Sequence, residues 1–267
     1  MVITLLSDFG DVYPASMKGV ILNINPEACI VDISHSVPQY DVRSGAFILL
    51  TGAGYFPGGT VHIAIVDPGV GTKRRPIAIR AGSKDHDIHY FIGPDNGLLI
   101  PAARSMGEFE VHEITNISLF RGDVSHTFHG MDIFAPVGAH ISKGMDICEV
   151  GKEIFDFVDL DFGKGKFKGD SLEGKVIFID PFGNIVTNIP SDIVDLKAGD
   201  IIEFQGKSVL FQTSYGYCKK GDPLVLIGSH GFLEFAINQG NAAYFFNKEQ
   251  GAEIILHMSS VKREIVR

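Results

Sequence analysis

A chain of 267 residues with 45% hydrophobic and 21% charged residues is long enough to bury a core in one large domain or two modest ones. Its net charge of -9 disfavours nucleic acid as a partner, because affinity for a phosphate backbone comes largely from clustered Lys and Arg. No stretch approaches the roughly 18 apolar residues of a membrane helix, no signal peptide is recognisable, and the cysteines are odd in number with no CxxC pair. We therefore expect a cytoplasmic protein that contacts no membrane and has no disulfide framework or zinc knuckle.

The first half of the chain alternates apolar strands with stretches of helical periodicity, which is typical of an α/β layer with buried strands. The expected elements, in chain order, are strand 2–6, helix 17–24, strand 30–33, helix 45–50, strands 61–66, 77–79 and 90–92, and helices 98–106 and 131–143. Polar motifs stand where the strands end. The pattern predicts an α/β domain over residues 1–165.

A second region begins near Ser171, after GKGKFKGD, whose composition and lack of periodicity indicate a linker. Helical spacing largely disappears beyond it. Short strands separated by Gly, Asn and Asp turns are expected at 175–179, 201–204, 208–212, 224–227, 243–246 and 253–257. The pattern is that of a small barrel or sandwich, so we predict a second, all-β domain over residues 171–262.

Acidic residues follow two of the predicted strands. Asp8 and Asp11 leave the first strand in SDFGD, and ligands of open α/β sheets bind at the carboxyl ends of strands, so Asp8 is placed to accept hydrogen bonds from ribose hydroxyls. The alternative is that Asp8 only caps the next segment. In IVDPGVGTKRRP, a tight turn can fold Arg74 or Arg75 back onto Asp67 and hold it ionised, or simply close the loop with a salt bridge. The motif is neither a dinucleotide fingerprint nor a phosphate loop.

Two further motifs follow in the first region. Asp95 and Asn96 in GPDNG are best explained as a turn in which Asx side chains bond their own backbone. His129 in SHTFHGMDIF stands at an expected strand-to-helix junction, where it can donate to a substrate or water, or be a satisfied loop histidine. A first-row metal is an alternative for these side chains, but an arginine among them would repel a cation, so no metal is expected. The ligands of such a site would be His126, His129, Asp67, Asp95 and Asp132.

The second region carries two candidate motifs between strands. IDPFGNIVTNI offers Asp180 and Asn184, and GSHGFLEFAIN offers Ser229, His230 and Glu234. An Asp, an Asn and a Ser can hold a zwitterionic amino acid, because the carboxylate takes the ammonium group and the neutral donors take the carboxylate. Each motif could equally be a hairpin turn, and only their joint presence argues for a site.

The chain resembles the SAM hydroxide adenosyltransferases (SAM hydrolases), which are relatives of the bacterial fluorinase and chlorinase. SDFG, VDPGVGTKRRP, GPDNG, TFHGMDIFAP, DPFGNIVTNI and GSHGFLEFAIN carry the resemblance, in the family's order and over nearly the whole chain. The resemblance implies an N-terminal α/β sandwich-like domain with a mostly parallel sheet and a C-terminal β-barrel domain. It also implies a homotrimer with active sites between subunits, and hydrolysis of S-adenosyl-L-methionine (SAM) to adenosine and L-methionine, with SAM as substrate and no cofactor.

By this resemblance, Asp67, Arg74 and His129 form the triad associated with water as the nucleophile. The halogenases look to have Tyr where this chain has Asp67, and Ser where it has Gly130. These two differences favour hydrolysis over halogenation. Met131 departs from the family, which usually has an Arg there. The implied substrate-binding positions are Asp8 for ribose, Asp180, Asn184 and Ser229 for methionine, Tyr215 beside the nucleoside, and Glu234, with the backbone near Ala236, at the adenine edge.

Three alternatives to SAM hydrolysis remain. They are a SAM-dependent halogenase of the chlorinase type, a non-catalytic protein that binds adenosine or SAM, and a metal-dependent hydrolase. Which of Arg74 and Arg75 faces the site is a question of register, and their place in the motif favours Arg74.

Overall fold

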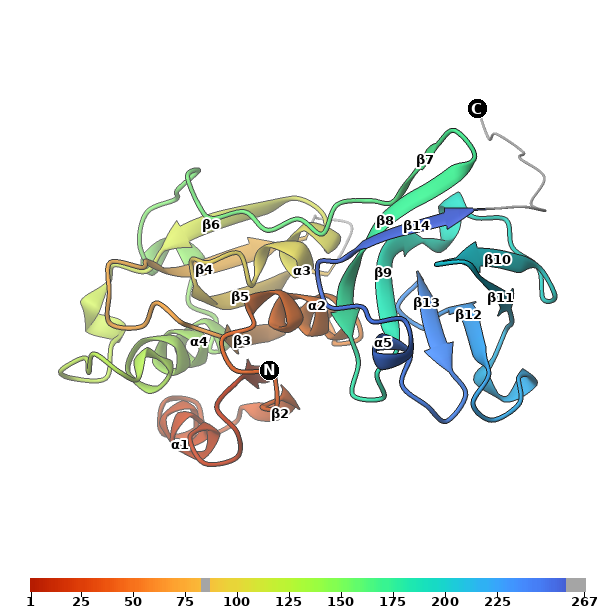
Figure 1. The fold of residues 1–267 in the computed structure, drawn as a ribbon. Coiled ribbons are helices and arrows are strands. Elements are labelled where there is room, and N and C mark those ends of the chain that lie inside the picture. Colours follow the sequence, from red (N-terminus) through yellow and green to blue (C-terminus); the bar gives the residue numbers. More distant parts are fainter. Residues whose placement is uncertain (83–86, 258–267) are drawn as a thin grey trace. The chain divides into compact units, whose positions relative to one another are not determined.

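The computed structural model describes residues 1–82 and 87–257 and divides into two compact units, Met1–Asp161 and Phe162–Arg267 (Figure 1). Residues 258–262, with which the predicted second domain ends, lie outside the described residues. Each unit has a hydrophobic core of its own. None of the described helices combines the length and the apolar character that crossing a bilayer requires.

The first unit is built on a mostly parallel sheet, as predicted. Within its described residues the strand order is β2-β1-β3-β5-β4-β6. β1 pairs in parallel with β2 and β3, and β3 with β5, whereas β4 runs antiparallel between β5 and β6. The prediction missed β6. The strands are β1 (Val2–Ser7), β2 (Cys29–Ser34), β3 (Val61–Ile65), β4 (Pro76–Ala81), β5 (His89–Pro94) and β6 (Phe109–Glu113).

Helices packed on this sheet complete the α/β sandwich. They are α1 (Pro14–Ile24), α2 (Val42–Ala53), α3 (Ile100–Ser105) and α4 (Ala135–Ser142). α1 packs against α4, and Met17 and Ile21 of α1 share a buried cluster with Ile3 and Ile63 of the sheet. α2 starts at Asp41, whose side chain accepts the Ser44 N–H at 3.0 Å, and packs against α3. The helix expected at 131–143 is α4 preceded by a π-helical turn, η2 (Gly130–Phe134).

The parallel strands bring the residues that follow them to one edge of the sheet. Ser7, the last residue of β1, lies opposite Ile65, the last residue of β3. Asp8 and Asp67 therefore leave neighbouring strands at the same edge, where open α/β sheets bind their ligands.

The second unit is a closed barrel. Seven of its described strands follow the order β14-β10-β11-β12-β13-β9-β8, and β14 pairs again with β8, while β7 extends the sheet beyond β8. The barrel confirms the predicted fold of this region. The strands are β7 (Lys166–Lys168), β8 (Ser171–Ile179), β9 (Ile185–Pro190), β10 (Ile201–Phe204), β11 (Lys207–Phe211), β12 (Pro223–Ile227), β13 (Phe232–Ile237) and β14 (Glu253–His257).

Two predictions for this unit were wrong. The strand expected at 243–246 is a short helix, α5 (Ala242–Phe245), because the Asn241 side chain accepts the Tyr244 N–H at 2.7 Å and so starts a helical turn. The stretch taken as a linker contains β7, which pairs with β8. β9 and β13 were also missed, because their residues were interpreted as turn and site motifs.

A pair of stacked histidines lies inside the first unit. The His62 ring nitrogens lie 2.7 Å from Thr4 Oγ1 and 3.0 Å from His89 Nδ1, and its ring stacks on Phe91. Burial, together with the neighbouring His89, lowers the pKa of His62 to about 3. His62 is therefore neutral in the folded protein.

This histidine is expected to make the fold acid-sensitive. An unfolded histidine takes up a proton below about pH 6.5, whereas folded His62 does not, so its contribution is complete above that pH and is lost as the pH falls toward 3. The loss amounts to about 1.4 kcal/mol per pH unit. Urea unfolding between pH 5 and 7 should show that His62→Leu loses up to about one proton of pH dependence relative to the wild type. An unchanged slope in His62→Leu would refute the assignment.

Candidate active site

Successive turns after β3 fold the chain back onto Asp67. The N–H of Val70 donates to Asp67 O, and the Thr72 hydroxyl donates to Gly69 O at 2.7 Å. Gly71 has φ +74°, and a Cβ there would collide with the carbonyl of His126, so only glycine fits. The turns return Arg74 to the carboxylate seven residues earlier.

Asp67, Arg74 and His129 converge into one cluster, as the resemblance predicted. Arg74 donates two hydrogen bonds to Asp67, from Nε to Oδ1 at 3.1 Å and from Nη2 to Oδ2. The same Nη2 lies 3.1 Å from His129 Nδ1. The side chains of Arg74 and Asp67 are only 8% and 4% exposed, so the ion pair is largely shielded from water.

The hydrogen bonds determine which ring nitrogen of His129 carries the proton. Arg74 has only donors, so Nδ1 accepts, and the hydrogen of the neutral imidazole is on Nε2. Burial lowers the pKa of His129, and the Arg74 charge lowers it further, against smaller opposing effects of Asp67 and Asp132. His129 is therefore neutral near pH 7 and presents an N–H at Nε2.

One donor of Arg74 has no partner. Its Nη1 is buried and makes no hydrogen bond within the described part of the chain, while its guanidinium carbon lies 5.4 Å from the centre of the Phe134 ring. An unpaired buried donor is costly, so Nη1 is the atom of this cluster that still needs an acceptor.

His129 is the residue that caps the start of η2, and the segment before it is a loop. The expected helix after His129 is therefore present, whereas the expected strand before it is not. The loop ends at η2, whose Asp132 accepts the Ser125 N–H at 3.0 Å. π-Helical turns are frequent at functional sites. Next to it, Arg121 Nη1 lies 3.9 Å from Met131 Sδ, so a guanidinium from the loop lies beside the residue at which the sequence departs from the family pattern it resembles.

Arg75 points to a different partner. It donates twice to Asp95 Oδ2, at 2.8 and 3.0 Å, and once to Asp156 Oδ1 at 2.9 Å. Asp95 Oδ1 accepts the Val158 N–H, and the Asn96 amide donates to a backbone carbonyl at 2.8 Å. Arg74 therefore belongs to the cluster, whereas Arg75 and the GPDNG motif hold loops in place.

Asp8 is bound by the segment after β2. Its Oδ2 accepts the Tyr40 N–H at 2.9 Å, and Tyr40 has φ +64°, a left-handed conformation that is rare for a non-glycine residue. Asp8 itself is half-buried. Its partner thus comes from another segment, which does not support the alternative that Asp8 merely caps the next one.

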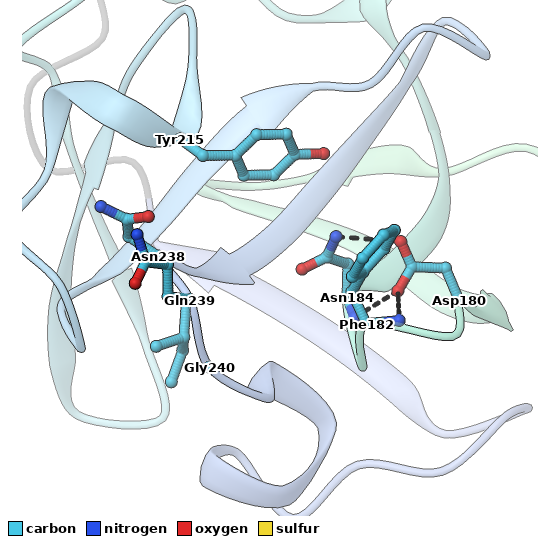
Figure 2. A pocket seen from close by; sticks show the side chains of 8 residues that line it. Asp180, Phe182, Asn184, Tyr215, Asn238, Gln239 and Gly240 are labelled. Carbon is cyan, nitrogen blue, oxygen red and sulfur yellow. Dashed lines mark hydrogen bonds between the residues drawn. The ribbon is translucent and has the colours of Figure 1, made fainter.

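The barrel unit has a pocket of about 590 Å³ (Figure 2). Asp180, Asn184 and Tyr215 of the predicted set line it, and Figure 2 shows Asp180 and Asn184 hydrogen-bonded side by side across the pocket from Asn238. Sequence reasoning missed the remaining lining residues, since a turn and the end of a strand carry no distinguishing motif. They are Phe182, Ile237, Asn238, Gln239 and Gly240.

The Asp180 motif is a hairpin turn and a pocket wall at once. Asp180 Oδ1 accepts the N–H groups of Phe182 and Asn184, at 2.9 and 2.8 Å, and Oδ2 accepts from the Asn184 amide at 2.9 Å. The carboxylate thus organises the turn that presents Phe182 and Asn184 to the pocket.

Glu234 is buried beside the pocket and both of its oxygens are bonded. The Tyr215 hydroxyl donates to Oε1 at 2.7 Å, and burial and this carboxylate raise the pKa of Tyr215. His230 accepts the Phe232 N–H at Nδ1, so Nε2 carries the hydrogen and lies 3.1 Å from Glu234 Oε2. Ser229 is exposed in the turn before β13 and is not among the residues that line the pocket.

The three carboxylates considered for a metal site lie beside arginines instead. Asp67 pairs with Arg74 and Asp95 with Arg75, and Asp132 lies 3.6 Å from Arg121. Among residues 1–82 and 87–257, no group of three or more His, Cys, Asp or Glu side chains is arranged to hold a metal ion.

The chain thus combines two features. Its α/β unit carries a carboxylate, guanidinium and imidazole cluster, and the unit that follows is a seven-stranded barrel with a pocket. The N-terminal domain of SAM hydroxide adenosyltransferase matches residues 3–151, and its C-terminal domain matches residues 174–255. The chain belongs to the SAM hydroxide adenosyltransferase family.

Relatives of this chain span nearly its whole length. It is 38% identical to an (R)-S-adenosyl-L-methionine hydrolase of Methanocaldococcus jannaschii, over 95% of this chain and 94% of that one. It is also 31% identical to a fluorinase of an Actinoplanes species, over 95% and 96%. An uncharacterized conserved protein from Thermotoga maritima has a similar structure, with a TM-score of 0.85 and 36% identity over 96% of this chain and 100% of that one.

Proposed function

We propose that this protein hydrolyses SAM to adenosine and L-methionine. The observation that carries the proposal is the buried cluster of Asp67, Arg74 and His129, with an unpaired donor on Arg74, in a chain related to several SAM hydrolases. The cluster has the donors and the acceptor that a nucleophilic water needs.

The reaction is a displacement at the 5′-carbon. A water oxygen forms a bond to C5′ while the C5′–S bond breaks. The electron pair of the C5′–S bond goes to sulfur, which leaves as the neutral thioether of methionine. The sulfonium is already a good leaving group, so no acid or metal is needed on that side. In-line placement of the water can contribute up to about 7–11 kcal/mol.

Asp67 is the only base that the cluster offers. Its ionised carboxylate takes the proton that the water loses, and Arg74 keeps it in place with two hydrogen bonds. His129 cannot act as the base through Nδ1, because Arg74 occupies that nitrogen. Its Nε2–H and the Nη1–H of Arg74 instead donate to the water and stabilise its hydroxide character.

The remaining predicted residues bind the substrate in this proposal. Asp8 takes ribose hydroxyls, and Asp180, Asn184 and Tyr215 use the barrel pocket, whose 590 Å³ is within the usual range for a small-molecule site. Glu234 acts through the Tyr215 hydroxyl that it orients. Ser229 stays the least supported member of the set, since it lies outside the pocket lining.

Gly130 supports hydrolysis over halogenation. A Cβ at this position would lie 3.1 Å from Phe128 Cε2, 3.2 Å from Ile65 Cδ1 and 3.3 Å from Met17 Sδ. By the resemblance, the halogenases have a serine at this position. In this chain the Cβ of such a serine would crowd these three side chains.

Overnight incubation with SAM, followed by liquid chromatography, tests the proposal. Adenosine and methionine are expected in equal amounts, and the yield should be unaffected by EDTA. Bound but unconverted SAM would indicate a binding protein, loss of activity with EDTA a metal-dependent enzyme, and 5′-chloro-5′-deoxyadenosine formed in chloride a halogenase. Homotrimeric assembly stays a prediction from the family resemblance, and light scattering after size exclusion tests it. A cytoplasmic location stays a prediction from the composition of the sequence.

The pH dependence of turnover should show the protonation of His129. Protonation at Nδ1 would set a second N–H against Arg74, so turnover is expected to fall as the pH drops through the lowered pKa of His129, below 6.5. His129→Asn keeps an acceptor for Arg74 but does not titrate, and should lose this acidic limb at a reduced rate. Circular dichroism at each pH separates the effect from acid unfolding. An identical limb in His129→Asn would contradict the assignment.

A further inference from the structure

A chain of polar side chains supports the loop that carries Asp8. Ser7 ends β1 with its side chain buried, and its Oγ lies 2.8 Å from His35 Nδ1. His35 Nε2 lies 3.1 Å from Asp32 Oδ1, and Lys18 Nζ donates to Asp32 Oδ2 at 2.5 Å. This series of side chains leads from the partly exposed Lys18 and Asp32 to the buried hydroxyl of Ser7.

Asp32 is the charged end of this series of side chains. Burial alone would raise the pKa of Asp32, but hydrogen bonds from Lys18 and His35 lower it below its ordinary value, so the carboxylate is ionised. His35 Nε2 faces this carboxylate at 3.1 Å, and its Nδ1 shares a hydrogen bond of 2.8 Å with the Ser7 hydroxyl. Ser7 Oγ in turn accepts the Phe9 N–H at 3.4 Å. The rotamer of Ser7 is thereby determined.

Backbone contacts join the same two segments. The Gly10 N–H donates to His35 O at 2.9 Å, and the Val37 N–H donates to Ser7 O at 3.4 Å. Asp8 lies between these contacts and accepts its hydrogen bond from Tyr40, five residues after His35. The segment that begins at His35 therefore holds the Asp8 loop at both of its ends.

We propose that His35 is a positioning residue for substrate binding: through Ser7 it fixes the loop from Ser7 to Gly10, and with it the point at which the Asp8 carboxylate meets the ribose. This rests on the proposed function, in which Asp8 binds ribose hydroxyls. The ribose is bound before and during the displacement alike, so loss of His35 should raise KM and leave kcat nearly unchanged.

Steady-state SAM hydrolysis by the full-length protein tests the proposal. His35→Leu is expected to raise KM roughly 5- to 10-fold, the range for one lost hydrogen bond, with kcat within about 2-fold. His35→Asn, whose amide can replace Nδ1 as the hydrogen-bond partner of Ser7, should restore KM. Ser7→Ala should match His35→Leu. The control is His257→Leu, which removes a similar His–Ser contact of 3.1 Å in the barrel and should leave KM unchanged.

A double variant separates positioning from general structural damage. If His35 acts through Asp8, then Asp8→Asn with His35→Leu should have no higher KM than Asp8→Asn alone. Additive rises in KM, or an unchanged KM in a folded His35→Leu, would overturn the proposal. Should His35→Leu not fold by circular dichroism, Ser7→Ala, which removes only the hydroxyl that contacts His35, must still raise KM. If the wild type does not hydrolyse SAM, the proposed function fails instead, and the Kd for adenosine across the same variants decides the role of His35.

Discussion

Replacing Asp67 with asparagine is expected to lower kcat by about 10²- to 10⁴-fold, the usual contribution of a general base. Asparagine keeps the size of the side chain but cannot take a proton from water or pair ionically with Arg74. KM for SAM should change little, because the proposed binding residues are elsewhere. Steady-state kinetics and calorimetric binding of SAM measure the two effects separately.

Asp95→Asn is the matched control for Asp67→Asn. Asp95 is also a buried carboxylate paired with an arginine, with a side chain 3% exposed against 4% for Asp67. Its loss should lower the melting temperature, since it strips Arg75 of a partner, yet kcat of the folded fraction should stay within about 2-fold. Turnover of a folded Asp67→Asn at the level of Asp95→Asn would remove Asp67 from the mechanism.

The adjacent arginines should respond in opposite ways to the same substitution. Arg74→Lys is expected to lower kcat by about 10²- to 10³-fold, because lysine cannot bind Asp67 through two nitrogens and donate to His129 and the water as well. Arg75→Lys should mainly lower stability, since Arg75 bonds Asp95 and Asp156. Melting temperatures and kcat of both variants provide the comparison.

The same two variants test which arginine of the motif, Arg74 or Arg75, faces the reacting groups. If Arg75→Lys lost turnover and Arg74→Lys kept it, Arg75 would be the arginine that reaches the reacting groups in solution, and the cluster described here would be the structural pair. Comparable losses in both variants would point to general disruption of the loop and would also count against the assignment.

The division into an α/β unit and an all-β unit could be predicted from the sequence, because buried positions recur at regular spacing along strands and helices. Apolar runs such as 61–66 identified strands buried on both faces, and β10 and β14 were predicted with their observed bounds. Polar residues directly after strands identified Asp8 and Asp67, since parallel strands bring their carboxyl ends to one edge. Local signals failed where a single side chain decided the outcome, as with the Asn241 cap that makes 242–245 a helix.

What the sequence determined by itself was therefore the identity of the candidate site residues and the order of the elements that carry them. The tertiary structure decided which groups meet: the turn through Gly71 brings Arg74 to Asp67 and leaves Arg75 to pair with Asp95, although the two arginines are neighbours in the chain. It also decided the proton on His129, because the tautomer follows from an Arg74 donor 55 residues away. Contacts between residues distant in sequence depend on backbone dihedrals accumulated along loops, and these leave no periodic pattern for a reader of the sequence to find.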